Sequence, residues 1–189
     1  MPRIDADHWG LVPAPGFDQP FEVLGACHER VQRMLSLLRR LRAHMQARGA
    51  DEQARQAACE LVRYFHIAAP VHHEDEERHV FPPLLARGEC VDTITRLRDE
   101  HREMAAIWPS AHAILDAVAE GRRTSLSLDD LEHLDHYETL YGWHLAAENE
   151  LVFPAARQHL GLEMQAAMGA EMARRRGLPD TSQPLRRGD

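Results

Sequence analysis

The stretch 72-HHEDEERHVFP-82 decides the fold, because its pattern recurs in 144-HLAAENELVFP-154. In both stretches a histidine is followed four residues later by a glutamate and nine residues later by Phe-Pro. Four residues advance an α-helix by slightly more than one turn, or about 6 Å along its axis, so each His-Glu pair points to one side. We therefore predict that each stretch is helical and presents two polar side chains together.

The spacing His-x-x-x-Glu is a weak signal by itself, since it starts at four histidines: His72, His73, His144 and His159. The shared Phe-Pro selects His72 and His144. His73 with Glu77 is the rival register in the first stretch, but it lies one residue off the inward seam of its helix and breaks the match to the second stretch.

Two single histidines extend the repeat over most of the chain. His28 stands 44 residues before His72, and His101 stands 43 residues before His144. Both interrupt otherwise apolar seams at helical spacing, so both should face the interior. The chain is therefore predicted to be two similar helical hairpins.

The composition favours an all-α fold, because the chain is 44% hydrophobic but only 6% aromatic. Glycine-containing breaks at 49–51, 87–89 and 121–127 separate four long helices, and short connections make neighbouring helices antiparallel. The expected parts are an irregular arm at 1–19, an up-and-down antiparallel four-helix bundle at 20–156, a C-terminal helix packed on the bundle at 157–176, and a flexible tail at 177–189. The bundle helices are expected at 20–48, 52–86, 91–120 and 128–154.

Charge and cysteine usage exclude several classes of protein. A net charge of -8 does not suit a nucleic-acid-binding surface, which needs clustered basic residues. Charges interrupt every long apolar stretch, and residues 1–10 lack the pattern of a signal peptide, so we expect a cytoplasmic protein without membrane contact. The 3 cysteines support neither a disulfide framework nor a zinc ribbon, and we expect reduced core thiols.

The repeat predicts a metal site. Packing two hairpins about a pseudo-twofold axis would bring six polar residues to one point inside the bundle: His28, His72, Glu76, His101, His144 and Glu148. Burying two carboxylates without positive charge would cost several kcal/mol each, so cations should occupy the centre. Nitrogen and oxygen donors without thiolate favour iron or manganese, whereas zinc is usually satisfied by four ligands. We predict two metal ions bridged by both glutamates, with a position left open for dioxygen or nitric oxide.

These motifs resemble the hemerythrin-like, HHE cation-binding family, whose pattern is a single histidine followed by His-x-x-x-Glu, twice over. The resemblance covers residues 20–156 and includes both Phe-Pro ends and the segment Cys27-His28-Glu29-Arg30. It implies a non-haem di-iron centre with an oxo or hydroxo bridge, in which manganese or zinc could substitute for iron. Members of the family bind dioxygen, sense oxygen or iron, or act in oxidative and nitrosative stress.

One departure from the family bears on function. Oxygen-carrying hemerythrins have a fifth histidine on the third helix, four residues from the first, where this chain has Leu97 and Ala105. The resemblance therefore does not imply simple reversible oxygen carriage. A further ligand, or a residue that supports a ligand, could be His79, Tyr141 or His73.

Several functions stay open at this point. The chain could bind or sense a small ligand, namely dioxygen, nitric oxide or peroxide, which requires no catalytic residue. It could instead be an enzyme that consumes peroxide or nitric oxide, for which only Tyr141 and His79 lie on inward seams as proton donors. Iron–sulfur repair is a further alternative, although we do not expect this protein to carry the cysteine-bearing amino-terminal domain of such relatives. No protein partner is indicated.

Overall fold

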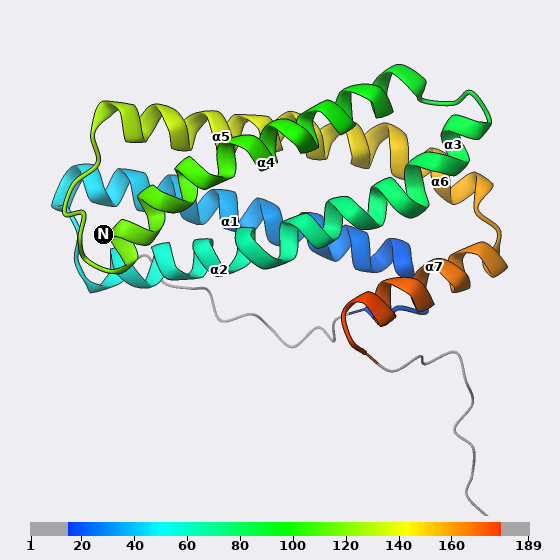
Figure 1. Cartoon of the computed structure of the whole chain (residues 1–189), viewed down its shortest axis with the longest axis horizontal. Helices are drawn as coiled ribbons and strands as arrows, with labels where there is room; N and C mark the ends of the chain where they lie inside the picture. The colour runs from blue at the N-terminus through cyan, green and yellow to red at the C-terminus, as the bar shows by residue number, and fades with distance from the viewer. Residues whose placement is uncertain (1–14, 179–189) are drawn as a thin grey trace, which may run out of the picture.

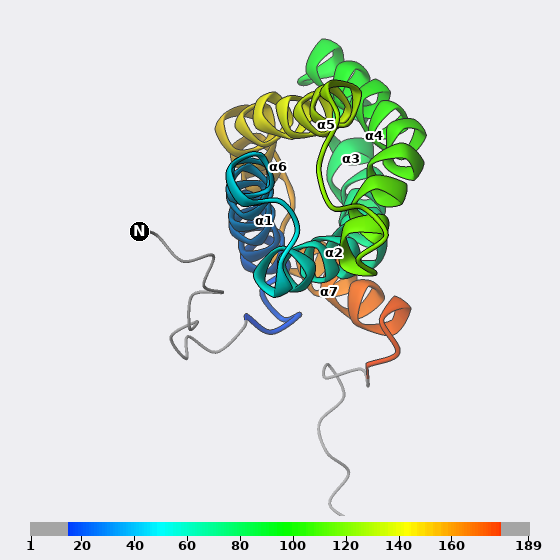
Figure 2. The ribbon, with the colours of Figure 1, turned by 90° about the vertical axis from the view of Figure 1, so that its left-hand side faces the viewer.

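Four long helices run side by side in the computed structural model, which describes residues 15–178 (Figure 1). They are α1 (Pro20–Arg48), α2 (Glu52–Asp75), α4 (Val91–Ala119) and α5 (Leu128–Ala147). Viewed along the bundle, α1 packs on α2, α2 on α4, α4 on α5 and α5 on α1 (Figure 2). No strand occurs within residues 15–178, so the predicted all-α bundle is confirmed. The predictions for residues 1–14 and 179–189 fall outside the described part.

The apolar core is divided into two clusters with a polar layer between them. On α1, Leu24 belongs to one cluster and Val31 to the other, and His28 lies between them. On α4, Leu97 and Met104 bracket His101 in the same way. The polar layer therefore interrupts the hydrophobic stripe of each helix. The apolar residues on either side of the layer shield it from water.

The second and fourth helices are not continuous as predicted, because each widens into a π-helical turn at its glutamate. These turns are η1 (Glu76–Val80) and η2 (Glu148–Val152), and each continues into a short helix, α3 (Phe81–Ala86) or α6 (Phe153–His159). The backbone N–H of Phe81 donates to the carbonyl of Glu76, and that of Phe153 donates to the carbonyl of Glu148. Proline has no N–H and collides with the carbonyl four residues earlier in an α-helix. The wider turn places each Phe-Pro in the first turn of a new helix, where proline fits.

The π turn in the first stretch also corrects the predicted inward position of His79. A π turn advances by a smaller angle per residue than an α turn, so residues after the glutamates point elsewhere than α-helical spacing suggests. Val80 and Val152 are completely buried, whereas Leu151 is 53% exposed. His79, its counterpart in the first stretch, faces the C-terminal helix instead of the interior and contacts Glu171 there.

The C-terminal helix α7 (Leu162–Arg175) lies outside the bundle (Figure 2), and it packs against α1. Asp75, at the end of α2, is fully buried and forms ion pairs with Arg175 and Arg176. Gly169 is required by this packing, because a Cβ there would lie 1.7 Å from the backbone oxygen of Phe17. Charge pairing and close backbone contact together fix α7 on the bundle.

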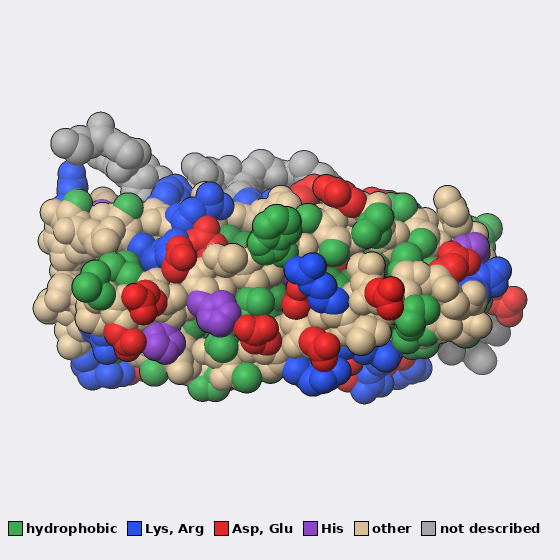
Figure 3. Space-filling model, turned by 90° about the horizontal axis from the view of Figure 1, so that it is seen from above, with side chains coloured by type: hydrophobic (Ala, Val, Ile, Leu, Met, Phe, Trp, Pro, Cys, Tyr) green, Lys and Arg blue, Asp and Glu red, His purple; other side chains and the backbone are tan. Residues whose placement is uncertain are grey.

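The surface carries mixed charge. Acidic and basic side chains are interspersed over the face shown in Figure 3. None of the helices within residues 15–178 is long and apolar enough to cross a membrane. All three cysteines are free, but the prediction of core thiols is wrong for Cys59, which lies on an exposed position of α2.

The start of α5 offers a test of local stability. Ser127 accepts a hydrogen bond from the backbone N–H of Asp130 at 3.1 Å, and Asp130 accepts one from the backbone N–H of Ser127 at 2.8 Å. Removing this reciprocal cap with Ser127→Ala should lower the free energy of unfolding by about 1 kcal/mol. Urea unfolding followed by circular dichroism measures the effect. Ser125→Ala, at a nearby exposed position, is the control, and an equal loss in both variants would contradict the assignment.

Candidate metal centre

Six side chains form the polar layer between the two core clusters, and each is at most 5% exposed. α1 contributes one, α2 with η1 contributes two, α4 contributes one, and α5 with η2 contributes two. They are the six predicted ligands: His28, His72, Glu76, His101, His144 and Glu148. The structure thus brings together all six residues that the repeat selects.

The two glutamates stand at the centre of this layer, each between imidazoles of both hairpins. Glu76 Oε1 lies 3.2 Å from His72 Nε2 and 3.5 Å from His28 Nε2, and Glu76 Oε2 lies 3.5 Å from His101 Nε2. Glu148 Oε1 lies 3.1 Å from His144 Nε2, and Glu148 Oε2 lies 3.2 Å from His28 Nε2. Each carboxylate can therefore offer one oxygen to each of two neighbouring cations.

The donor atoms divide into two overlapping sets. One contains His28 and His72, the other contains His101 and His144, and both contain Glu76 and Glu148. Within each set the candidate ligand atoms lie within 4.8 Å of one another. Two ions that share both carboxylates would use every member of the layer.

The hydrogen-bonding state of these atoms fits a cation. Both oxygens of Glu76 and of Glu148 are enclosed and accept no hydrogen bond from the described residues. The Nε2 atoms of His28 and His72 are also enclosed without a hydrogen-bond partner there. Buried polar groups in this condition are rare in folded proteins, and bound cations would satisfy all of them.

The layer is electrostatically coupled. Burial alone would lower the pKa of His28, but Glu148 and Glu76 outweigh it and raise that pKa to about 10. The same balance, with Glu148 and Glu100 as the anions, raises the pKa of His144 to about 10. Burial would raise the pKa of Glu76, yet the surrounding imidazoles, led by His72, hold it well below its usual range. Glu76 is therefore ionised and attracts positive charge into the layer.

The second nitrogen of three of these imidazoles has a partner outside the layer. The Nδ1–H group of His28 can donate to Asn149 Oδ1 at 2.8 Å, and that of His101 to Glu77 Oε1 at 2.7 Å. His144 Nδ1 lies 3.0 Å from Glu100 Oε2. Such contacts hold a proton on Nδ1, so that Nε2 is the nitrogen that would bind an ion in the interior.

The Phe-Pro phenylalanines cover the two single histidines. The Phe153 ring stacks on His28 with centroids 4.8 Å apart, and the Phe81 ring stacks on His101 at 5.8 Å. Each phenylalanine thus belongs to the opposite hairpin from the histidine that it covers. The shared Phe-Pro therefore helps to close the polar layer as well as to end the helix.

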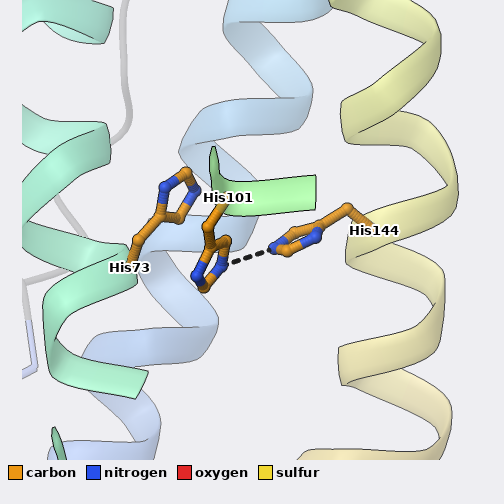
Figure 4. A group of neighbouring side chains, drawn as sticks. All are labelled: His73, His101 and His144. Atoms are coloured by element: carbon orange, nitrogen blue, oxygen red, sulfur yellow. Dashed lines mark hydrogen bonds between the residues drawn. The ribbon is translucent and has the colours of Figure 1, made fainter. Parts of the chain in front are cut away.

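His73 lies closer to the layer than its sequence position suggested. His73 as a whole is only partly buried, but its Nε2 atom is fully enclosed and has no hydrogen-bond partner in the described residues. With His101 and His144 it forms a third group of candidate ligands. Figure 4 shows His73 and His144 approaching His101 from opposite sides.

The other two additional candidates lie differently. His79 is outside all three groups found among the described residues and contacts Glu171 at 2.7 Å. Tyr141 is buried, with its ring centroid 6.5 Å from that of His144, and its hydroxyl is 3.5 Å from that of Tyr137. Burial raises the pKa of Tyr141 well above its usual value, so it is a neutral phenol.

Sequence reasoning missed the residues that support the imidazoles. Glu77 and Asn149 directly follow the two buried glutamates, and Glu100 directly precedes His101. A signal was present, because Glu77 and Asn149 occupy the same place in the two repeats. The rival register that paired His73 with Glu77 also has a physical basis, since both contact His101, although only Glu76 enters the layer.

Comparison with known proteins agrees with this geometry. The family described as Hemerythrin HHE cation binding domain matches residues 19–156. A protein of Haemophilus influenzae, recorded as an uncharacterized protein, is 28% identical over 161 residues, which cover 85% of this chain and 91% of the relative. The match spans all four long helices and the whole polar layer, whose buried histidines and glutamates are typical of a hemerythrin two-metal site. The chain therefore belongs to the hemerythrin HHE cation-binding domain family.

Proposed function

We propose that this chain is a cytoplasmic di-iron protein that binds a small ligand, dioxygen, nitric oxide or peroxide, and acts in oxygen or iron sensing or in the response to oxidative and nitrosative stress. His28 and His72 would hold one ion, His101 and His144 the other, and Glu76 and Glu148 both. When bound, two irons would supply redox chemistry and an open coordination position. Manganese or zinc could occupy the same donors.

One observation carries this proposal: two fully buried carboxylates share a layer with four imidazoles and accept no hydrogen bonds from the described residues. In the metal-free protein only protons on the imidazoles can balance the two carboxylates, and both partners still bear the cost of desolvation. Apolar side chains of similar size would stabilise such a bundle better. Metal binding therefore explains why these six polar side chains lie in the core.

The number of donors supports a role for His73 as a further ligand. The family's oxygen carriers place a fifth histidine on the third helix, and here Leu97 belongs to the apolar core while His73 arrives from α2. We include His73 as a third imidazole for the ion held by His101 and His144. The ion held by His28 and His72 then has fewer protein donors and more room for a small ligand.

The access route supports a small ligand. A surface cleft of about 640 Å³ is lined by His28, Asn149 and residues of α1, including Gln32. His28 itself is 2% exposed, so only its edge meets the cleft. Diatomic molecules and peroxide are small enough to pass where a larger substrate is not.

The test is iron reconstitution of the metal-free chain. We expect about two irons per chain, and the reduced protein should change its optical spectrum on addition of dioxygen, nitric oxide or hydrogen peroxide. Reversal of the change on removing the ligand supports binding or sensing. Sustained consumption of peroxide or nitric oxide would show an enzyme instead. A stably folded chain that takes up no iron would overturn the proposal.

A further inference from the structure

The two halves of the polar layer differ in the charge behind their imidazoles. His101 Nδ1 lies 2.7 Å from a Glu77 oxygen, and His144 Nδ1 lies 3.0 Å from a Glu100 oxygen. Both acceptors are carboxylates. The half formed by His101 and His144 is therefore supported by two carboxylates, of which Glu100 is also paired with the exposed Arg96.

The other half has neutral support. His28 Nδ1 lies 2.8 Å from the amide oxygen of Asn149, and His72 Nδ1 is enclosed without a hydrogen-bond partner among the described residues. Asn149 stands where Glu77 stands in the other repeat, and Cys27 stands where Glu100 stands, one residue before the single histidine. A thiol is a weak acceptor. The pseudo-twofold symmetry of the ligands is thus broken in the residues that support them.

A carboxylate that accepts the Nδ1–H hydrogen bond makes the imidazole a stronger donor and fixes its orientation. Loss of such a partner typically lowers metal affinity 10–100-fold. Two carboxylates on one side and none on the other should therefore separate the affinities of the two positions by about 100-fold or more.

We propose that the two metal positions fill in order, the one at His101 and His144 before the one at His28 and His72, and that Glu77 and Glu100 are the positioning residues that set this order. The inference rests on the proposed function, since it requires that two ions bind. It goes further by assigning an order of filling and the residues that set it. The second position, next to the cleft that reaches His28, is the one that exchanges its ion readily.

The order is tested by titrating the metal-free chain with Co²⁺, using calorimetry and a competing chelator together with the visible absorption of the bound ion. The expected result is two resolved binding steps, with dissociation constants about 100-fold apart or more. Glu77→Gln should weaken the first step about 10–100-fold and leave the second unchanged. Asn149→Asp should strengthen the second step and bring the two dissociation constants closer together.

Glu103→Gln is the matched control, because Glu103 also contacts an imidazole, that of His136 at 3.0 Å, but on the exposed surface. It should change neither step. Thermal melts check that every variant folds. The Glu77 side chain is 43% exposed, so its replacement should leave the fold intact. Two ions bound with equal affinity, or a Glu77→Gln effect confined to the second step, would overturn the inference and leave the proposed function standing. Failure of the unaltered chain to bind any ion would instead reject the proposed function.

Discussion

Replacing Glu76 with alanine is expected to abolish binding of both metal ions. Its two oxygens face opposite halves of the layer, one toward His28 and His72 and the other toward His101. Removing a shared donor therefore weakens both positions at once. Since loss of a mere supporting partner costs 10–100-fold in affinity, loss of the shared carboxylate should cost on the order of 100-fold or more at each position. Metal analysis after dialysis against a weak chelator measures the loss.

The comparison within the acidic run makes this prediction specific. Glu77→Ala should have a smaller effect, mainly on the position at His101, because Glu77 contacts only the outer nitrogen of that imidazole. Glu29→Ala, at an exposed position next to His28, should have no effect. Glu148→Ala should repeat the result of Glu76→Ala, because Glu148 is its counterpart in the second hairpin. Equal metal contents in the Glu76, Glu77 and Glu29 variants would contradict the bridging role.

Metal affinity should rise steeply with pH. In the metal-free protein the pKa of His28 and of His144 is raised to about 10, so both imidazoles are protonated near pH 7. A metal ion needs the unprotonated nitrogen, and each ion must therefore displace about one of these protons. Below pH 10 the apparent affinity of each position should increase about tenfold for every unit of pH. Acidification has the opposite sign and should release both ions.

Competition with a chelator of known pH dependence, from pH 6 to pH 8, measures this slope. Calorimetry in buffers of different ionisation enthalpy counts the released protons independently. The variant His133→Gln, which removes a partly exposed imidazole on α5 outside the layer, should leave the slope unchanged. Affinities that stay constant over this range would show that the imidazoles are already unprotonated before metal binds.

The bundle and its polar layer follow from local sequence pattern. All four long helices begin at the predicted residues, and α1 and α4 also end within one residue of the prediction, because glycine breaks and the caps at Asp51 and Ser127 act over a few residues. The repeat selected six residues that the structure buries together. A period of about 3.6 residues specifies an inward face without knowledge of the partner helices. This part of the prediction therefore needed no tertiary information.

The parts of the site that sequence reasoning misplaced or missed depend on tertiary structure. His73 lies one residue off the seam of α2, but α2 packs against both α1 and α4, so its interior face is wider than a single seam. His79 was misplaced because spacing along an ideal α-helix cannot anticipate the π turn in which it lies. The partners Glu77, Glu100 and Asn149 act across helices, and their roles become visible only when the hairpins are packed together.

The ion pairs of Asp75 extend the folding unit beyond the segment that matches the family. That segment ends at residue 156, yet Arg175 and Arg176 provide the positive charge beside a fully buried aspartate that directly precedes Glu76. Without α7 and Arg176 the Asp75 carboxylate would lose the two cations that balance it and the segment that covers it, directly beside Glu76. The smallest fragment of this protein that can hold the metal layer intact therefore reaches at least to Arg176.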